Sequence, residues 1–194
     1  SDTVILKENV VVGAFTSIGE KTVIDEGSHI GSNVTIGRHC KIGKSCMIYS
    51  GVTLYDHTEI GDHVIIHSGS IIGADGYGLV SDNNTHNKIP HIGSVSIGNN
   101  VWIGSNCSID RGTLSNTVIG SGSKLDNLIH IAHNVIIGNN CLMAAQVGIA
   151  GSTIVGDNTV IGGQAGISGH LRIGSNVKIG GASGVTNDIP DNSQ

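Results

Sequence analysis

The sequence predicts an all-β solenoid built from six-residue units. Three observations predict this fold class. An aliphatic residue recurs at every sixth position over most of the chain, Gly supplies 30 of the 194 residues, and the aromatic residues are only one Phe, one Trp and three Tyr. Short parallel strands can stack an aliphatic ladder, and the tight turns between them favour glycine. Such a core needs no aromatic side chains, which accounts for the composition.

The aliphatic positions, here called anchors, form three runs. One run covers residues 6–72, a short one covers residues 97–109, and the last covers residues 119–185. Gly often follows an anchor, with Asn or Asp soon after, and these residues tolerate tight turns. A small or β-branched residue stands two positions before most anchors, so each unit supplies two inward side chains. Three units make a triangular coil of 18 residues, and neighbouring coils stack about 4.8 Å apart.

The period fails in two places. Residues 74–91 replace three units with a polar, glycine-rich excursion, and residues 110–116 contain a shorter insertion. We expect a single domain over residues 1–190 that carries these two loops. Such a loop either is a tolerated insertion without a role or reaches over a cleft or a neighbouring subunit. The sequence leaves both alternatives open.

The repeat also assigns the four cysteines. Each lies two residues before an anchor, at the small inward position, and no CxxC pair occurs. We therefore predict buried thiols, rather than disulfides, zinc ligands or nucleophiles, at Cys40, Cys46, Cys107 and Cys141.

Most of the ten histidines have an ordinary explanation. Three of them follow an anchor by three residues, a turn position, and are expected to be solvated: His39, His57 and His63. His39 and His57 are 18 residues apart and should stack on adjacent coils. Four others carry no spacing signal: His29, His67, His86 and His91.

His133 differs because of what lies in phase with it. It stands two residues beyond the anchor Ile131, and one coil later the same position is Gly151. The Gly151 backbone should therefore lie about 5 Å away on the next coil. A histidine beside an unhindered backbone N–H can form a general base and an oxyanion donor. His170 lies on the same side of the triangle two coils along, and an inert surface histidine is the alternative for each.

Charge and hydropathy exclude other classes. The net charge is −5, and the ten Lys and Arg are scattered singly, which does not favour nucleic acid as a partner. No apolar stretch approaches the roughly 20 residues that span a bilayer, and we expect no export signal. We expect a cytoplasmic protein without a membrane span.

Several motifs punctuate the repeat in a fixed order and spacing. They are Gly73-Ala74-Asp75-Gly76-Tyr77-Gly78, Lys88-Ile89-Pro90, Ile109-Asp110-Arg111-Gly112, Lys124-Leu125-Asp126-Asn127, Ile131-Ala132-His133-Asn134, Gly148-Ile149-Ala150-Gly151-Ser152, Gly162-Gly163-Gln164 and Ile167-Ser168-Gly169-His170. Across residues 10–190 the chain thereby resembles the UDP-3-O-acylglucosamine N-acyltransferases of lipid A biosynthesis. A generic hexapeptide acetyltransferase would share the anchors but not these motifs.

The resemblance implies a homotrimer of left-handed parallel β-helices with active sites in the clefts between subunits. In that family an acyl group, commonly 3-hydroxyacyl, moves from the phosphopantetheine of acyl carrier protein to the 2-amine of a UDP-3-O-acyl-glucosamine. The expected partners are therefore acyl carrier protein and a UDP-amino-sugar. No metal and no separate cofactor are implied.

The resemblance also implies roles for individual residues. His133 corresponds to the general base, Gly151 to the donor of the oxyanion N–H, and His170 to a histidine that assists binding or the transition state. Asn127 matches a residue near the substrate. Two neighbours of these motifs are expected to bind substrate as well: Asp126 and His130, the latter at a position where glutamine is common in the family.

Two departures keep other hypotheses open. Members of the family usually carry an N-terminal uridine-binding domain and a C-terminal helical extension, neither of which is expected within these 194 residues. An acyl-CoA or acetyl-CoA-dependent N-acyltransferase acting on another nucleotide amino sugar is therefore the alternative enzyme. A non-catalytic scaffold, or an ice- or metal-binding relative, is a third hypothesis, although the turn positions lack the repeated Thr ladder of an ice-binding face.

Overall fold

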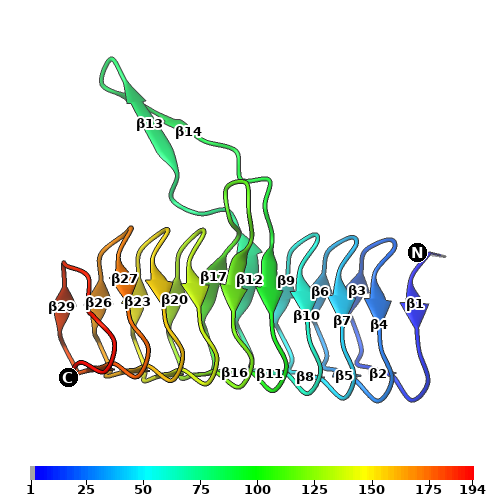
Figure 1. The fold of residues 1–194 in the computed structure, drawn as a ribbon. Coiled ribbons are helices and arrows are strands. Elements are labelled where there is room, and N and C mark those ends of the chain that lie inside the picture. The colour runs from blue at the N-terminus through cyan, green and yellow to red at the C-terminus, as the bar shows by residue number, and fades with distance from the viewer. Residues whose placement is uncertain (1–2) are drawn as a thin grey trace.

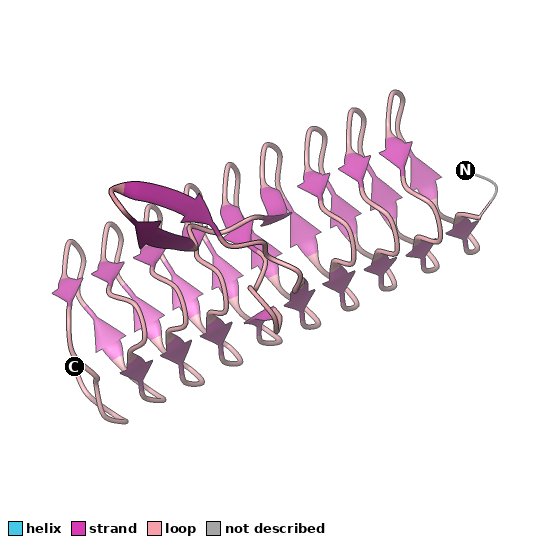
Figure 2. Cartoon of the chain, turned by 90° about the horizontal axis from the view of Figure 1, so that it is seen from above, coloured by secondary structure: helices cyan, strands magenta, loops and turns pink. Residues whose placement is uncertain are grey.

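Three parallel nine-stranded sheets are wound into one solenoid in the computed structural model, which describes residues 3–194 (Figure 1). Sheet A contains β1 (Ile5–Leu6), β4 (Val23–Ile24), β7 (Lys41–Ile42), β10 (Glu59–Ile60), β15 (Val95–Ile97), β18 (Thr117–Ile119), β21 (Ile136–Ile137), β24 (Ile154–Val155) and β27 (Arg172–Ile173). Sheet B contains β2 (Val11–Val12), β5 (His29–Ile30), β8 (Met47–Ile48), β11 (Ile65–Ile66), β16 (Trp102–Ile103), β19 (Lys124–Leu125), β22 (Leu142–Met143), β25 (Val160–Ile161) and β28 (Lys178–Ile179). Sheet C contains β3 (Ser17–Ile18), β6 (Thr35–Ile36), β9 (Thr53–Leu54), β12 (Ile71–Ala74), β17 (Ser108–Asp110), β20 (His130–Ile131), β23 (Gly148–Ile149), β26 (Gly166–Ile167) and β29 (Gly184–Val185). Figure 2 shows the coils following one another along a single axis.

The anchors fill the centre of the coils, as predicted. Ile42 lies beside Ile24 on one coil and beside Ile60 on the other, and all three are buried. Leu6 and Val12, in the first coil, are 48% and 37% exposed, because among the described residues only the second coil packs against them. The aliphatic ladder is the hydrophobic core of the whole described chain.

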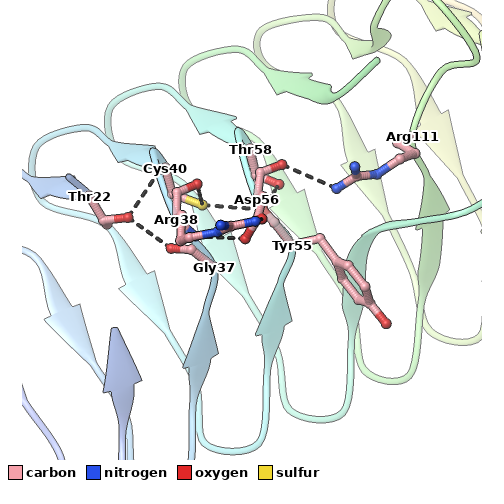
Figure 3. A network of polar contacts seen from close by, with 8 residues as sticks. All are labelled: Thr22, Gly37, Arg38, Cys40, Tyr55, Asp56, Thr58 and Arg111. Carbon is pink, nitrogen blue, oxygen red and sulfur yellow. Dashed lines mark hydrogen bonds and ion pairs between the residues drawn. The ribbon is translucent and has the colours of Figure 1, made fainter. Parts of the chain in front are cut away.

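The second inward position holds small residues that bond to neighbouring coils. Thr22 Oγ1 donates to the Gly37 carbonyl at 2.8 Å and accepts the N–H of Cys40 at 3.1 Å (Figure 3). Cys40 takes the same position one coil later, with Sγ 3.2 Å from the Tyr55 carbonyl. All four cysteines are free and buried, as predicted, and burial raises the pKa of each thiol.

The coils turn at three corners, where side chains of the next coil accept hydrogen bonds from backbone N–H groups. Many corner residues adopt a φ near +60°, among them Asn33 and His39. At the corner between sheets C and A, here called the C–A corner, the Arg38 N–H donates to Asp56 Oδ1 of the next coil at 2.7 Å. The rings of His39 and His57 stack at this corner with centroids 4.9 Å apart, as predicted.

The long excursion forms an antiparallel hairpin, β13 (Leu79–Asp82) and β14 (Thr85–Lys88), that projects from the middle of the solenoid (Figure 1). Arg111 fixes its base, because its Nε donates to the Gly73 carbonyl at 2.7 Å. Its Nη2 donates to the Asp56 carbonyl at 3.2 Å (Figure 3). The shorter loop begins one residue later than expected, at 111, because Asp110 still pairs with Ala74 as the end of β17.

No helix within residues 3–194 is long and apolar enough to cross a membrane.

Candidate functional site

A groove of about 580 Å³ runs along the outer face of sheet C towards its last strand. Three consecutive strands, β23, β26 and β29, each place a glycine at the outward position. A Cβ added to any of these glycines would meet nothing within 4 Å, so packing within the chain does not require them. We call them the glycine floor: Gly148, Gly166 and Gly184. The groove also has walls that include Tyr77, His130, His133, Gly151, Ser168 and Thr186.

The His133 ring stands at one edge of this groove and is enclosed on several sides. A Cβ on Gly151 would lie 2.7 Å from Cε1 and Nε2 of the ring, so the Gly151 backbone is in close contact with the ring tip. A Cβ on Gly76 would lie 2.9 Å from Cδ2 of the same ring, so the long excursion packs against a second side of the His133 ring. The His91 ring meets His133 edge to face, with centroids 5.3 Å apart.

A hydrogen-bond network determines the tautomer of neutral His133. The Thr113 N–H donates to Asn134 Oδ1 at 3.0 Å, which identifies that atom as an acceptor. His133 Nδ1 lies 3.1 Å from the same oxygen and must therefore carry the proton. The lone pair of the neutral imidazole is then on Nε2, the nitrogen that faces Gly151.

The Gly151 N–H has no hydrogen-bond partner in the described part of the chain. At the same corner five coils earlier, the equivalent N–H of Arg38 donates to Asp56, which stands 18 residues further along the chain. Here residue 151 is followed 18 residues later by Gly169, which has no side chain to accept the bond. The donor is thus left free beside the ring of His133.

His170 lies on the C–A corner as predicted, but outside the groove lining. Its N–H donates to the Gly151 carbonyl at 3.0 Å, and its side chain is exposed. The structure therefore brings His133, Gly151 and His130 to the groove and leaves His170 beside it.

Asn127 and Asp126 lie at the opposite edge of sheet C, because β20 separates them from His133. Asn127 Oδ1 accepts the Ser105 N–H at 2.7 Å, and Asp126 Oδ1 accepts the Asn127 N–H at 2.8 Å. Asp126 lines a separate apolar groove of about 330 Å³ on sheet B. Within one chain these two residues do not reach the groove on sheet C.

Some residues of the site escaped the sequence analysis. The glycine floor has an 18-residue period, so coil arithmetic could have found it. His91 carries no such signal, because the long excursion brings it into place, whereas Asn134 and Asp110 stand within the quoted motifs but were given no role there. Asp110 is 6% exposed, and burial raises the pKa of its carboxyl, while positive charge on His130, His133 or His91 would lower it.

No group of three or more His, Cys, Asp or Glu side chains within residues 3–194 is arranged to hold a metal ion.

Comparison with protein families gives a decisive match. The family described as bacterial transferase hexapeptide (six repeats) matches residues 3–38, 39–74 and 116–151. The chain belongs to this family. A hexapeptide repeat of succinyl-transferase also matches residues 94–127.

Relatives of this hexapeptide transferase carry acyltransferase names. It is 59% identical over 69 residues to the UDP-3-O-acylglucosamine N-acyltransferase of Dechloromonas aromatica, and 59% identical over 70 residues to UDP-3-O-acylglucosamine N-acyltransferase 2 of Legionella pneumophila. Each match covers 36% of this chain and 20% of the relative. The chain thus spans about one fifth of the length of the relatives it matches.

Solved structures resemble the hexapeptide transferase over nearly its whole length. The UDP-N-acetylglucosamine O-acyltransferase of Moraxella catarrhalis superposes with a TM-score of 0.72 at 27% identity, over 98% of this chain and 68% of the other. LpxA from Acinetobacter baumannii gives 0.74 at 29% identity, over 96% and 69%. The fold is a left-handed parallel β-helix, as the resemblance predicted.

Proposed function

We propose that this chain is the catalytic solenoid of an N-acyltransferase that uses His133 as its general base. The substrates would be a 3-hydroxyacyl group on acyl carrier protein and the 2-amine of a UDP-3-O-acyl-glucosamine, in the cytoplasm. The observation that carries the proposal is the pairing of an unprotonated Nε2 on His133 with a free N–H on Gly151 at the edge of one groove.

Each of these groups has a defined task in acyl transfer. The amine nitrogen attacks the thioester carbonyl carbon, and His133 Nε2 takes one proton from the amine. The oxygen that becomes negative in the tetrahedral intermediate accepts the Gly151 N–H. When the intermediate collapses, the C–S bond breaks and the departing thiolate takes the proton back from Nε2. Asn134 orients the ring throughout, because its Oδ1 holds Nδ1–H.

The glycine floor supports an acyl donor with a long chain. Three stacked glycines leave about 10 Å of strand surface without side chains, counted as two strand spacings. An acetyl group would not use such a length. The floor therefore favours the long-chain donor over acetyl-CoA, which was the alternative.

The homotrimer belongs to the same proposal. Asn127 and His133 stand at opposite edges of sheet C, so the two do not line one groove of a single chain. A second copy that presents its Asn127 edge to the His133 groove would bring them together, and cyclic symmetry would repeat that contact.

Release of the carrier thiol in the presence of the acylated amino sugar tests the reaction. The protein should release thiol from 3-hydroxyacyl carrier protein but not from acetyl-CoA, and His133→Ala should lose at least about 100-fold in rate. Equal use of acetyl-CoA, or near-normal activity in His133→Ala, would overturn the proposal. Light scattering tests the trimer, and a catalytically active monomer would contradict a site shared between copies.

A further inference from the structure

Beside His133 a buried carboxylate lies within electrostatic range of three imidazole rings. Asp110 ends β17, and the neighbouring strand β20 carries His130, whose Nε2 is 3.8 Å from Asp110 Oδ2. The Asp110 side chain is 9% exposed, whereas that of His130 is 52% exposed. A carboxylate in this position is costly to keep charged unless a positive group stands close to it.

His91 forms the second side of this cluster. Its Nδ1 lies 2.9 Å from the Ile89 carbonyl, so Nδ1 carries the proton and Nε2 the lone pair. The residue is 5% exposed, and Nε2 has no hydrogen-bond partner among residues 3–194. A buried acceptor left in this state can take a proton when a negative charge stands near it.

The long excursion packs both rings into place. A Cβ on Gly78 would lie 2.7 Å from His91 Cε1, and one on Gly76 would lie 2.8 Å from His133 Cβ. No larger residue fits at either position without moving a ring. The excursion therefore covers the rings of His91 and His133, and Coulomb interactions on this covered side are less screened than at an open surface.

The charges that face Asp110 come from every element around it. His91 follows the hairpin, while His130 and His133 belong to β20 and the turn after it. Asp75 is a like charge, and the hydrogen bond from Lys88 together with the charges of Lys88 and Arg111 holds the pKa of Asp75 low. The imidazoles are therefore the groups that can supply a positive charge beside the Asp110 carboxylate.

We propose that Asp110 is a positioning residue that stabilises the positive charge His133 acquires during acyl transfer. When His133 is neutral, His91 and His130 share the proton that balances the charge of the Asp110 carboxylate. The inference rests on the proposed function for its catalytic consequence. The charge coupling itself exists in the resting protein, where it can be measured without substrate. Asp110 acts through His133 and does not touch the reacting atoms.

The first experiment follows the ring signals of histidine-labelled protein by NMR as the pH changes. In Asp110→Asn, the pH at which the His133 ring takes up its proton should fall, since a nearby negative charge favours the protonated imidazole. Asp62→Asn is the matched control, because Asp62 closes a distant corner through an oxygen that Asn retains. It should leave the His133 titration unchanged.

A reciprocal measurement covers the case in which Asp110→Asn fails to fold. In His133→Gln, the carboxyl carbon of Asp110 should titrate at a higher pH than in the parent protein, because one positive neighbour is lost. If neither titration moves in a folded variant, the inference is wrong. If they move but the parent protein transfers no acyl group, the charge coupling stands and the proposed function fails.

The pH profile of kcat/KM supplies the catalytic readout. Asp110→Asn should lower the maximum about tenfold or more and move the acid limb to lower pH, because a weaker base loses its proton earlier. A purely structural role would lower the rate without moving that limb, and this result would also overturn the inference.

Discussion

Replacing Gly151 by Ala tests the arrangement of the site at its tightest contact. The added Cβ would stand 2.7 Å from Cε1 and Nε2 of His133, whereas ordinary contact begins at 3.4 Å. The ring must therefore retreat by about 0.7 Å, the difference between those distances. Gly151 does not adopt a positive φ, so the backbone accepts Ala without strain. A displacement approaching 1 Å in a catalytic group can cost about 100-fold in rate, equivalent to about 2.7 kcal/mol in the barrier.

Steady-state kinetics and thermal unfolding together measure this effect. We expect kcat to fall by about 100-fold, with KM and the unfolding temperature changing less, because the added Cβ displaces the ring tip without straining the backbone. Gly180→Ala is the matched control, since its Cβ would meet only Ser183 Oγ at an ordinary 3.6 Å. Retention of full activity in Gly151→Ala would refute the assignment of Nε2 and the Gly151 N–H to the reaction. An equal loss in Gly180→Ala would show that the solenoid, rather than the ring, was disturbed.

Further predictions concern the groove, the hairpin and the thiols. Gly166→Leu should abolish use of long-chain donors while the unfolding temperature holds or rises, because the side chain enters open space and replaces a flexible strand glycine; kinetics with donors of graded length check this. The hydrogen bond from Lys88, and then the charges of Lys88 and Arg111, lower the pKa of Asp75 from 3.8. The Asp75 carboxylate therefore stabilises the hairpin fully above pH 3.8, and this stabilisation is lost as the pH falls through the lowered pKa. Limited proteolysis should therefore cut the hairpin of Asp75→Asn faster than that of the parent protein at pH 7, and hydrogen exchange in the hairpin should become equal in the two proteins at pH values well below 3.8. A disulfide reagent at pH 8 should leave all four thiols unmodified until the protein unfolds, since burial raises the pKa of each; prompt reaction of the native protein would contradict the assignment of Cys40, Cys46, Cys107 and Cys141.

Periodic features of this chain could be predicted from the sequence because each coil repeats the same physical problem. An aliphatic side chain every six residues has one place to go, so the anchors and the buried thiols follow from spacing alone. The contact between His133 and Gly151 follows in the same way, since residues 18 apart must be neighbours in adjacent coils. The glycine floor obeys the same arithmetic.

Features that depend on the two loops could not be predicted, because no local rule sets the path of a loop. His91 reaches His133 only because Arg111 and Lys88 fix the base and end of the long excursion. Asn127 shows a different limit of sequence analysis. Its motif predicts a substrate contact, but in the structure its Oδ1 accepts the N–H of Ser105 and so stabilises a turn of the preceding coil. A motif can record both tasks, and sequence alone does not separate them.

A solenoid that only repeated could stack identical groups but could not surround one of them differently from the rest. His133 and His170 illustrate this, because both stand on the C–A corner, two coils apart. His170 is exposed there, whereas His133 contacts Gly76 and His91 from the long excursion and is oriented by Asn134, which the shorter loop holds through Thr113. The two insertions break the translational symmetry near one level of the coil, and there a corner histidine acquires a fixed tautomer and packs against the long excursion. The position of a single proposed base in a repeating fold thus follows from the loops, while its distance to the oxyanion donor follows from the repeat.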